Sequence, residues 1–312
     1  MGEGRASLHI AVLYNEILSG LRPQPGGRYV DGTVGAGGHA EGLLAASSPS
    51  GQLLGLDRDP AAIRLAQAKL ERFGARCILV QGSYVEMSRE AAVLGWESAS
   101  GILLDLGLSS MQLEDAERGF SFQHDGPLDM RFDPSAPVSA ADLVNGLSQE
   151  ELADLLFRLG EEWQARRVAR EIVRARPVRG TGHLAEIAAR AKGRRRGGIH
   201  PATKTFQALR IAVNEELEVL PEGLEVATRL LEPGGRIAVI SFHSLEDRIV
   251  KRAFQRLTAG ATSTEGGPRT PAQGVFELVT RKPVTPGEEE TASNKHSRSA
   301  KLRIIQKNAP MA

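Results

Sequence analysis

Glycines and acidic residues follow one another closely at the end of the first apolar segment of the chain. Residues 29–39 read Tyr-Val-Asp-Gly-Thr-Val-Gly-Ala-Gly-Gly-His, so an apolar run ends in an acid and enters a glycine-rich turn. Glycine has no Cβ and tolerates positive φ, which lets the backbone approach a ligand closely. Residues Gly35–Ala40 fit the pattern G-x-G-x-x-G/A, and Asp57 follows after about 22 residues at the end of the next apolar run. This spacing predicts a nucleotide-like cofactor, and NAD and S-adenosyl-L-methionine fit it about equally.

Another acid follows a later apolar run. Asp105 comes near the end of the sequence GILLDL and precedes Ser109. In doubly wound enzymes, ligands lie at the edge of the sheet where the strands end. Enzymes that methylate exocyclic amines often have an acid or Asn followed by Pro-Pro-aromatic here, and this chain has the acid without the Pro-Pro-aromatic. Asp105 and Ser109 are therefore candidate catalytic residues, and capping of the following turn is the alternative for Asp105.

The chain has a candidate histidine after its strong late apolar segment, Arg236–Phe242. His243 either contacts a substrate or makes a structural hydrogen bond in the turn. Ser244 with Asp247 is the simplest N-cap pair for the helix that follows.

Cys77 is the only cysteine, which excludes an internal disulfide and a cysteine-cluster metal site and fits a reducing compartment. Methylation of a pyrimidine carbon usually needs a cysteine nucleophile that activates the ring. Because Cys77 lies inside an apolar segment, far from the expected ligand edge, it is better explained as a small core residue. This argues against carbon methylation and leaves transfer to nitrogen or oxygen open. We predict no metal site.

The elements that must position these residues alternate between strand and helix patterns. Four apolar segments in the first third predict strands of a parallel, doubly wound α/β sheet: Arg28–Val34, Gln52–Asp57, Arg76–Gln81 and Gly101–Leu106. A helix lies between the second and third, with Asp59 as its N-cap and Pro60 as its first residue. Strand patterns return late in the chain, at Arg236–Phe242, Val275–Thr280 and Ser299–Ile305.

The alternation stops for about ninety residues, and only helix patterns follow there, including one that starts with a capping box of Ser148 and Glu151. We therefore predict a sheet domain of residues 1–110 and 203–312 with an inserted, mainly helical domain of residues 111–202. The helical stripe of Thr203–Leu220 is assigned to the return into the sheet domain. Residues 259–274 and 285–297, rich in Gly, Ser, Thr, Pro and Glu, are predicted to be loops.

Charge is distributed unevenly along the inserted region. Residues Arg158 to Lys204 contain 13 Lys/Arg and 4 Asp/Glu, a balance of +9, whereas Ser109 to Phe157 have a balance of −8. Arginines suit bidentate phosphate contacts, so the basic stretch predicts contact with nucleic acid; the alternative is a solvated helix face. Two sets of arginines are the candidate RNA-binding residues. They are Arg166, Arg170 and Arg174, spaced by four along one helix face, and Arg194, Arg195 and Arg196.

Taken together, several longer runs resemble one family, the small-subunit ribosomal RNA methyltransferase H family, also called MraW. The runs are DGTVGAGGH (31–39), LDRDP (56–60), LLDLGLSSMQLEDAERGFSF (103–122), GPLDMR (126–131), TFQALRIAVNEEL (205–217), VISFHSLEDRIVK (239–251) and SRSAKLR (297–303). Their order and spacing cover nearly the whole chain. The resemblance implies a class I, Rossmann-like methyltransferase sheet with an inserted helical domain. It also implies methylation of cytosine N4 at one position in the decoding region of 16S rRNA, with S-adenosyl-L-methionine as cofactor.

The resemblance also implies cofactor contacts, which are carried over by motif. They are Gly37, Gly38 and His39 in the first run, Asp57 in LDRDP, Tyr84 after the third strand, and Asp105 and Gln112 in LLDLGLSSMQL. The chain departs from the family in three places: Tyr84 replaces a common Phe, Met111 stands where many members have Pro, and Lys295-His296 precede the last run where Arg is commoner.

Three rival functions share some of these features. A nicotinamide-dependent oxidoreductase would use the same glycine turn, a non-catalytic ribosome-assembly factor would keep the basic surface, and a related methyltransferase would act on DNA or protein. We expect a cytoplasmic protein whose partner is the small ribosomal subunit, because the chain has neither a secretory signal pattern nor an apolar run that approaches the roughly 20 residues needed to span a bilayer. The expected oligomeric state is a monomer or a homodimer.

Overall fold

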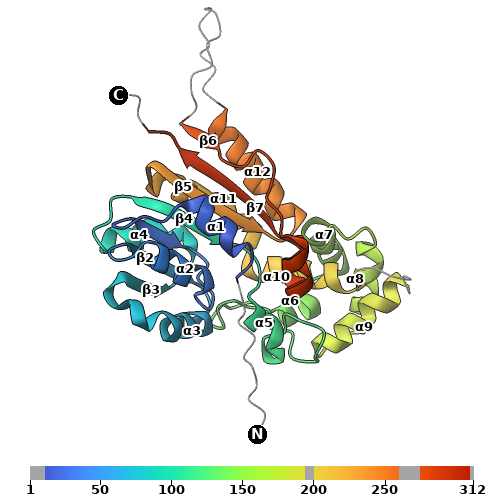
Figure 1. The fold of residues 1–312 in the computed structure, drawn as a ribbon. Coiled ribbons are helices and arrows are strands. Elements are labelled where there is room, and N and C mark those ends of the chain that lie inside the picture. The colour runs from blue at the N-terminus through green and yellow to red at the C-terminus, as the bar shows by residue number, and fades with distance from the viewer. Residues whose placement is uncertain (1–10, 194–199, 260–274, 310–312) are drawn as a thin grey trace, which may run out of the picture. The chain divides into compact units, whose positions relative to one another are not determined.

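The structure is a computed structural model that describes residues 11–193, 200–259 and 275–309, and the chain divides into two compact units (Figure 1). One unit, called the sheet unit below, contains residues 1–107 and 219–312. The other, called the helical unit, contains residues 108–218.

Within the described residues, the sheet unit is built on a seven-stranded sheet of order β3-β2-β1-β4-β5-β7-β6. Strands β1 to β5 are parallel to one another, and β7 runs antiparallel to both β5 and β6. The strands are β1 (Arg28–Asp31), β2 (Gln52–Asp57), β3 (Cys77–Gln81), β4 (Ala99–Asp105), β5 (Leu231–Ser241), β6 (Phe276–Leu278) and β7 (Lys301–Lys307). All seven coincide with segments expected from the apolar pattern to within a few residues, except that β5 begins five residues early.

Helices cover both faces of this sheet. Side chains alternate between the two faces along each strand, so both faces present apolar groups to the helices. One face packs against α1 (Tyr14–Leu21), α2 (Gly38–Ala46) and α3 (Pro60–Leu70). The opposite face packs against α4 (Met87–Val93), α11 (Glu216–Leu230) and α12 (Ser244–Thr258). Along β4, for example, Leu103 points to the first face and Ile102 and Leu104 to the second. Both layers bury continuous apolar cores, as expected for strands covered on each side.

The helical unit has its own apolar core, formed by Leu152 and Leu156 of α7, Val168 and Ile172 of α8 and other side chains. Its elements are α5 (Ser110–Glu114), η3 (Ala116–Arg118), α6 (Ala140–Gly146), α7 (Gln149–Gly160), α8 (Ala165–Arg174), α9 (Thr181–Lys192) and α10 (Thr203–Asn214). Helix α10 contacts α7 and belongs to this unit, whereas the sequence placed residues 203–220 in the sheet domain.

The helical stripe predicted over Thr203–Leu220 lies in two helices, because α10 ends at Asn214 and α11 begins at Glu216. The residue between them, Glu215, has φ of 52°, in the left-handed region, and its N–H donates to the carbonyl of Ile211. That conformation ends one helix and redirects the chain into the next.

Helix starts show which local predictions succeed. Asp59 caps α3 by accepting a hydrogen bond from the N–H of Ala61, and Ser148 forms the expected capping box with Glu151 at the start of α7. The prediction of Ser244 as the N-cap of α12 is wrong. His243 is the N-cap, and the third residue of its capping box is Glu246.

Shorter elements complete the sheet unit: η1 (Glu71–Arg76), η2 (Tyr84–Glu86), α13 (Glu288–Ser293) and η4 (Lys295–Ser299). The prediction of a loop over residues 285–297 is therefore wrong, since α13 and the start of η4 lie there. A long-range bond explains the difference, because Glu290 Oε1 accepts a hydrogen bond of 2.8 Å from the N–H of Leu13. The other predicted loop, residues 259–274, lies almost wholly outside the described residues. Among the described residues, none of the helices combines the length and apolar character needed to cross a membrane.

Candidate functional site

Three acids lie at the carboxyl edge of the sheet. The register pairs Asp31 at the end of β1 with Gly55 of β2 and with Leu103 of β4. Asp57 and Asp105 lie two residues further along β2 and β4 and end those strands. Because β1, β2 and β4 are parallel neighbours, the structure brings all three carboxyl groups to the edge where open α/β sheets hold ligands.

The glycine-rich turn leads from β1 to α2 and is tied to Asp57. The N–H of Gly35 donates to Asp57 Oδ2 at 2.9 Å, and the N–H of Asp59 donates to Asp57 Oδ1 at 2.9 Å. Gly35 and Gly37 have φ of 53° and 82°, which a side chain would adopt only with strain. Each oxygen of an ionised carboxylate has two lone pairs, so Asp57 can hold the turn and still accept hydrogen bonds from hydroxyl groups.

Helix α2 begins directly after this turn, and its N-cap residue accepts no side-chain hydrogen bond from the first N–H groups. Its N-cap, Gly37, offers no side-chain acceptor. The first N–H groups of a helix have no partner within the helix, and the helix dipole adds positive potential there. The start of α2 is therefore suited to an anionic group such as a carboxylate.

His39 and Asp105 face each other beside the turn. His39 Nε2 lies 3.6 Å from Asp105 Oδ2, and the ring of His39 stacks on Tyr14 of α1 with centroids 6.2 Å apart. Both ring nitrogens of His39 and Oδ1 of Asp105 are buried and make no hydrogen bond of normal geometry among the described residues, although the backbone of Val12 lies near the imidazole. Buried polar atoms without partners are uncommon in folded proteins and point to a ligand or ordered water. The buried polar atoms of this site therefore fit a polar cofactor.

Burial sets the protonation of this cluster. It lowers the pKa of His39 to about 4, so the imidazole is neutral at pH 7. Burial, together with repulsion from Asp57, raises the pKa of Asp31 to about 7. Burial, with repulsion from Asp31 and Glu246, also raises the pKa of Asp105 well above its usual value. A positive charge placed beside these carboxyls would favour their ionised forms.

Thr33 connects two of these strand ends. The N–H of Asp105 donates to Thr33 Oγ1 at 2.6 Å, and the N–H of Thr33 donates to Asp31 Oδ1 at 3.2 Å. The sequence-based site missed Asp31 and Thr33 as members. The signal was available, because Asp31 ends its strand in the same way as Asp57 and Asp105 end theirs.

The remaining predicted cofactor residues lie in different surroundings. Tyr84, in η2, is buried in the core on the α11 face of the sheet, where a Cβ on Gly223 would come within 2.2 Å of its ring. Gln112 belongs to the helical unit. It is buried at the start of α5, where its side chain accepts from the N–H of Ser109 and Ser109 Oγ accepts from the N–H of Gln112. The cofactor contacts of Tyr84 and Gln112 and the catalytic role of Ser109 stay predictions.

His243 is engaged at the start of α12. Its Nδ1 accepts from the N–H of Glu246 at 3.4 Å, and its Nε2 lies 3.1 Å from Glu246 Oε1. This is the hydrogen-bonded turn that the sequence offered as the alternative to substrate contact. A catalytic role for His243 stays a prediction.

Three of the six candidate RNA-binding arginines lie in the described residues. Arg166, Arg170 and Arg174 are exposed on α8, and the latter two each lie 3.3 Å from Glu171. Arg194, Arg195 and Arg196 lie outside the described residues.

An exposed aromatic pair next to α8 was missed by the sequence analysis. Trp163 is 84% exposed and Phe157 is 52% exposed, and their rings form an edge-to-face pair with centroids 6.1 Å apart. An exposed tryptophan of this extent marks a candidate interaction site. Its exposure could not be predicted, since an apolar residue next to a helix is more often buried.

Comparison with known proteins places the chain in a family. A profile described as "MraW methylase family" matches residues 6–308. The chain belongs to the MraW methylase family. Proteins named ribosomal RNA small subunit methyltransferase H are similar to it over nearly their whole length. That of Citrifermentans bemidjiense is 51% identical over 311 residues (96% of this chain, 98% of the relative), and that of Thermomicrobium roseum is 49% identical over 309 residues (97% and 95%).

The family assignment confirms two predictions, the resemblance to the MraW family and the class I methyltransferase fold, which the observed doubly wound sheet has. Among solved structures, a SAM-dependent O-methyltransferase from Thermotoga maritima is similar at a lower level. It is 11% identical with a TM-score of 0.42, covering 96% of this chain and 66% of that chain. That likeness is too distant to say anything about the substrate of an MraW methylase.

Proposed function

We propose that this chain transfers a methyl group from S-adenosyl-L-methionine to N4 of a cytosine in the decoding region of 16S rRNA. The observation that carries the proposal is the pair His39 and Asp105, with three buried atoms that make no hydrogen bond of normal geometry among the described residues, beside the turn that Asp57 holds. The names of relatives about 50% identical over nearly the whole chain support an rRNA of the small subunit as substrate.

Each part of the carboxyl edge suits one part of this cofactor. The uncapped start of α2, at Gly38, would receive the methionine carboxylate. Asp57 would accept the ribose hydroxyls, and the carboxyl of Asp105 would be the partner of the positive sulfonium. When bound, S-adenosyl-L-methionine supplies an electrophilic methyl group that needs no metal.

The protein's own residues must orient the acceptor amine. The amino group of cytosine is a poor nucleophile because its lone pair is delocalised into the ring. A carboxyl oxygen of Asp105 can accept a hydrogen bond from this amine and hold its lone pair in line with the methyl group, which is the main requirement for transfer. The amine becomes much more acidic after transfer, so its proton can leave without a strong general base.

The position and protonation of Cys77 argue for a nitrogen, and against a ring carbon, as the acceptor of the methyl group. It begins β3, at the amino edge of the sheet and therefore at the opposite end of the strands from Asp57. Burial raises the pKa of its thiol to about 11, so little thiolate is present at pH 7. Cys77 is thus unsuited to the covalent activation that carbon methylation usually requires.

The helical unit is proposed to hold the RNA. Exposed arginines of α8 would bind phosphates, and Trp163 would stack on an unpaired base, since base stacking on an aromatic ring is independent of sequence. In this division, the helical unit fixes the position of the RNA and the sheet unit performs the chemistry.

The proposal is tested by incubating the protein with methyl-labelled S-adenosyl-L-methionine and small subunits that lack the modification. Label in the rRNA with the wild-type chain and none with Asp57→Ala is the expected result. Label only in ribosomal protein would indicate a protein methyltransferase. Binding of subunits without transfer of label would indicate an assembly factor instead.

A further inference from the structure

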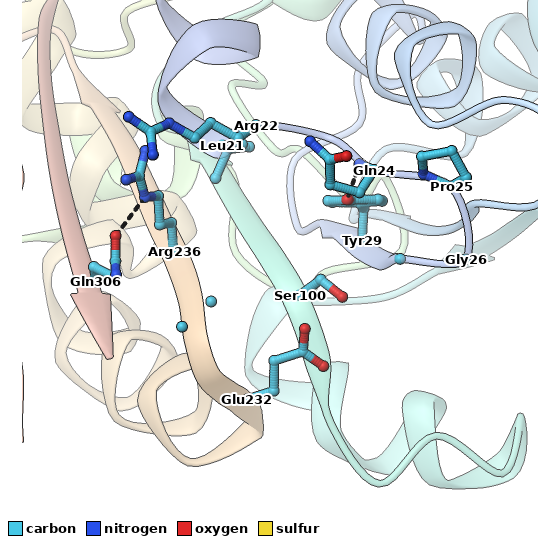
Figure 2. Close-up of a pocket in the computed structure, with 13 residues that line it drawn as sticks. Leu21, Arg22, Gln24, Pro25, Gly26, Tyr29, Ser100, Glu232, Arg236 and Gln306 are labelled. Atoms are coloured by element: carbon cyan, nitrogen blue, oxygen red, sulfur yellow. Dashed lines mark hydrogen bonds between the residues drawn. The ribbon is translucent and has the colours of Figure 1, made fainter. Parts of the chain in front are cut away.

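A concave site lies at the amino edge of the same sheet. It is a cleft of about 470 Å³, lined in part by Arg22, Gln24, Tyr29, Ser100, Glu232 and Arg236 (Figure 2). Ser100 precedes Asp105 by five residues along β4, a distance of about 17 Å at the usual rise of a strand. The cleft is therefore separate from the proposed cofactor site, and its volume suits a ligand of nucleotide size.

Two guanidinium groups dominate one side of the cleft, where Figure 2 shows Arg22 next to Arg236. Arg236 Nε donates to Gln306 Oε1 at 2.8 Å, and its Nη1 donates to the carbonyl of Gly20 at 2.7 Å. Both acceptors are neutral, and neither arginine forms an ion pair within residues 11–193, 200–259 and 275–309. Burial and the charge of Arg22 lower the pKa of Arg236, and the nearby carboxylate of Glu277 acts in the opposite direction. Two adjacent cations that form no ion pair among the described residues are suited to bind an anion.

The end of α1 places Arg22 at the cleft. Arg22 follows α1 with φ of 51° and ψ of 62°, in the left-handed region. Glu161 after α7 and Glu215 after α10 have nearly the same conformation, so it marks the end of a helix. One of the two residues that supply positive charge to the cleft is thus positioned by the end of α1.

The other side of the cleft offers different chemistry. Glu232 presents a carboxylate, which accepts hydrogen bonds, and Gln24 presents an amide. The phenol oxygen of Tyr29 accepts from the N–H of Gln24 at 2.7 Å, which ties this wall together. A ligand that fills the cleft would therefore have an anionic group at the arginines and hydroxyl or amino donors toward Glu232.

We propose that this cleft binds a nucleoside monophosphate, with its phosphate on Arg22 and Arg236 and the donors of its ribose or base on Glu232. The inference does not depend on the proposed methyl transfer, because it uses only residues at the amino edge. The phosphate monoester could belong to a free nucleotide or to the 5′ end of an RNA.

The test is calorimetric titration of the full chain with guanosine 5′-monophosphate in the presence of saturating S-adenosyl-L-methionine. Guanosine monophosphate avoids the adenine of the cofactor and the cytosine of the proposed substrate. We expect saturable binding that weakens about tenfold in Arg22→Ala, because one charged hydrogen-bonding partner is lost. Arg64→Ala, which removes an exposed arginine of α3, is the matched control and is expected to bind like wild type.

Two further titrations sharpen the result. Guanosine without phosphate is expected to bind at least about tenfold more weakly than the monophosphate. Arg236→Lys keeps the charge but loses the planar fork, and it should also weaken binding. The site is wrong if guanosine monophosphate gives no saturable binding, or if wild type, Arg22→Ala and Arg64→Ala bind it equally. A 5′-phosphorylated trinucleotide that competes would point to an RNA end as the source, and its failure to compete would point to a free nucleotide.

Discussion

The two units handle charge in opposite ways. The sheet unit buries its ionisable groups at the carboxyl edge, where Asp31, His39 and Asp105 have shifted pKa values. The helical unit exposes its arginines on the surface of α8. Under the proposed function, a small cofactor is held by groups in fixed positions away from water, whereas an RNA backbone is bound by exposed cations that remain hydrated until contact. The comparison predicts that changes in one unit alter one ligand only.

The largest effect is expected from Asp31→Asn on the stability of the sheet unit. The pKa of Asp31 is about 7 in the folded chain and near 3.8 when unfolded, so the folded state retains a proton that the unfolded state loses. Wild type should therefore lose stability relative to the variant as pH rises from about 4 to about 7, and the difference should be constant above pH 7. The full difference is on the order of 4 kcal/mol. Chemical denaturation at several pH values measures it.

Comparison with the variant isolates Asp31 from His39, whose lowered pKa has the opposite influence, since wild type gains stability from His39 as pH rises between about 4 and 6.5. Parallel pH profiles for wild type and Asp31→Asn would show that Asp31 is ionised in the folded chain, contrary to the proposed electrostatics.

The next effect concerns Asp57→Ala and the cofactor. The substitution removes the acceptor of the Gly35 and Asp59 N–H groups together with the proposed partner of the ribose hydroxyls. Affinity for S-adenosyl-L-methionine should fall about 100-fold, while affinity for rRNA should be unchanged. Calorimetry with the cofactor and filter binding with RNA give the two numbers. Asp154→Ala, an exposed acid of the helical unit, is the control, and unchanged cofactor affinity in a folded Asp57→Ala chain would remove Asp57 from the site.

The reverse pattern is expected for the arginines of α8. A chain with Arg166, Arg170 and Arg174 all changed to Gln should bind rRNA about 10- to 100-fold more weakly near 0.1 M salt and bind the cofactor normally. The slope of log affinity against log salt should decrease in magnitude by about 2, because phosphate contacts release counterions.

The control for that experiment carries the same loss of charge in the sheet unit. It has Gln at Arg64, Arg89 and Arg229, all of them exposed. If both triple variants change the salt dependence equally, net charge alone explains the binding, and the helical unit has no special part in it.

The smallest effect is expected for Trp163→Ala. Loss of a base-stacking ring should weaken RNA binding about tenfold without changing the salt slope, because stacking releases no counterions. Trp163→Phe should restore part of the affinity. A weakened chain whose rescue by Phe fails, or whose salt slope changes, would contradict a stacking role.

Much of the sheet unit could be predicted from the sequence. Its strands are short apolar runs bounded by turn residues, and Asp57 was found because its spacing from the glycine turn is set by one helix and one strand. Helix α13 could not be predicted, since its polar composition indicates a loop and its anchor is a bond from Leu13 to Glu290 across the chain. The N-cap of α12 was misjudged because Ser244 has the stronger local preference, while His243 has a partner in Glu246.

The candidate site shows the same limit. Asp31 was visible as a residue, but its burial and raised pKa depend on β2 and β4 packing beside β1. Trp163 was missed because sequence patterns predict which apolar residues are buried far better than which are exposed. Sequence therefore identifies groups that a motif holds together and misses those that tertiary packing defines.

The most direct test of the proposed function is the chemical identity of the methylated nucleoside. Small subunits lacking the modification are incubated with the wild-type chain and S-adenosyl-L-methionine, and the 16S rRNA is digested to nucleosides for mass spectrometry against standards. The account predicts one new product, an N4-methylated cytidine from the decoding region, and its loss with Asp57→Ala. A 5-methylated cytidine, or a methylated nucleoside other than cytidine, would contradict it.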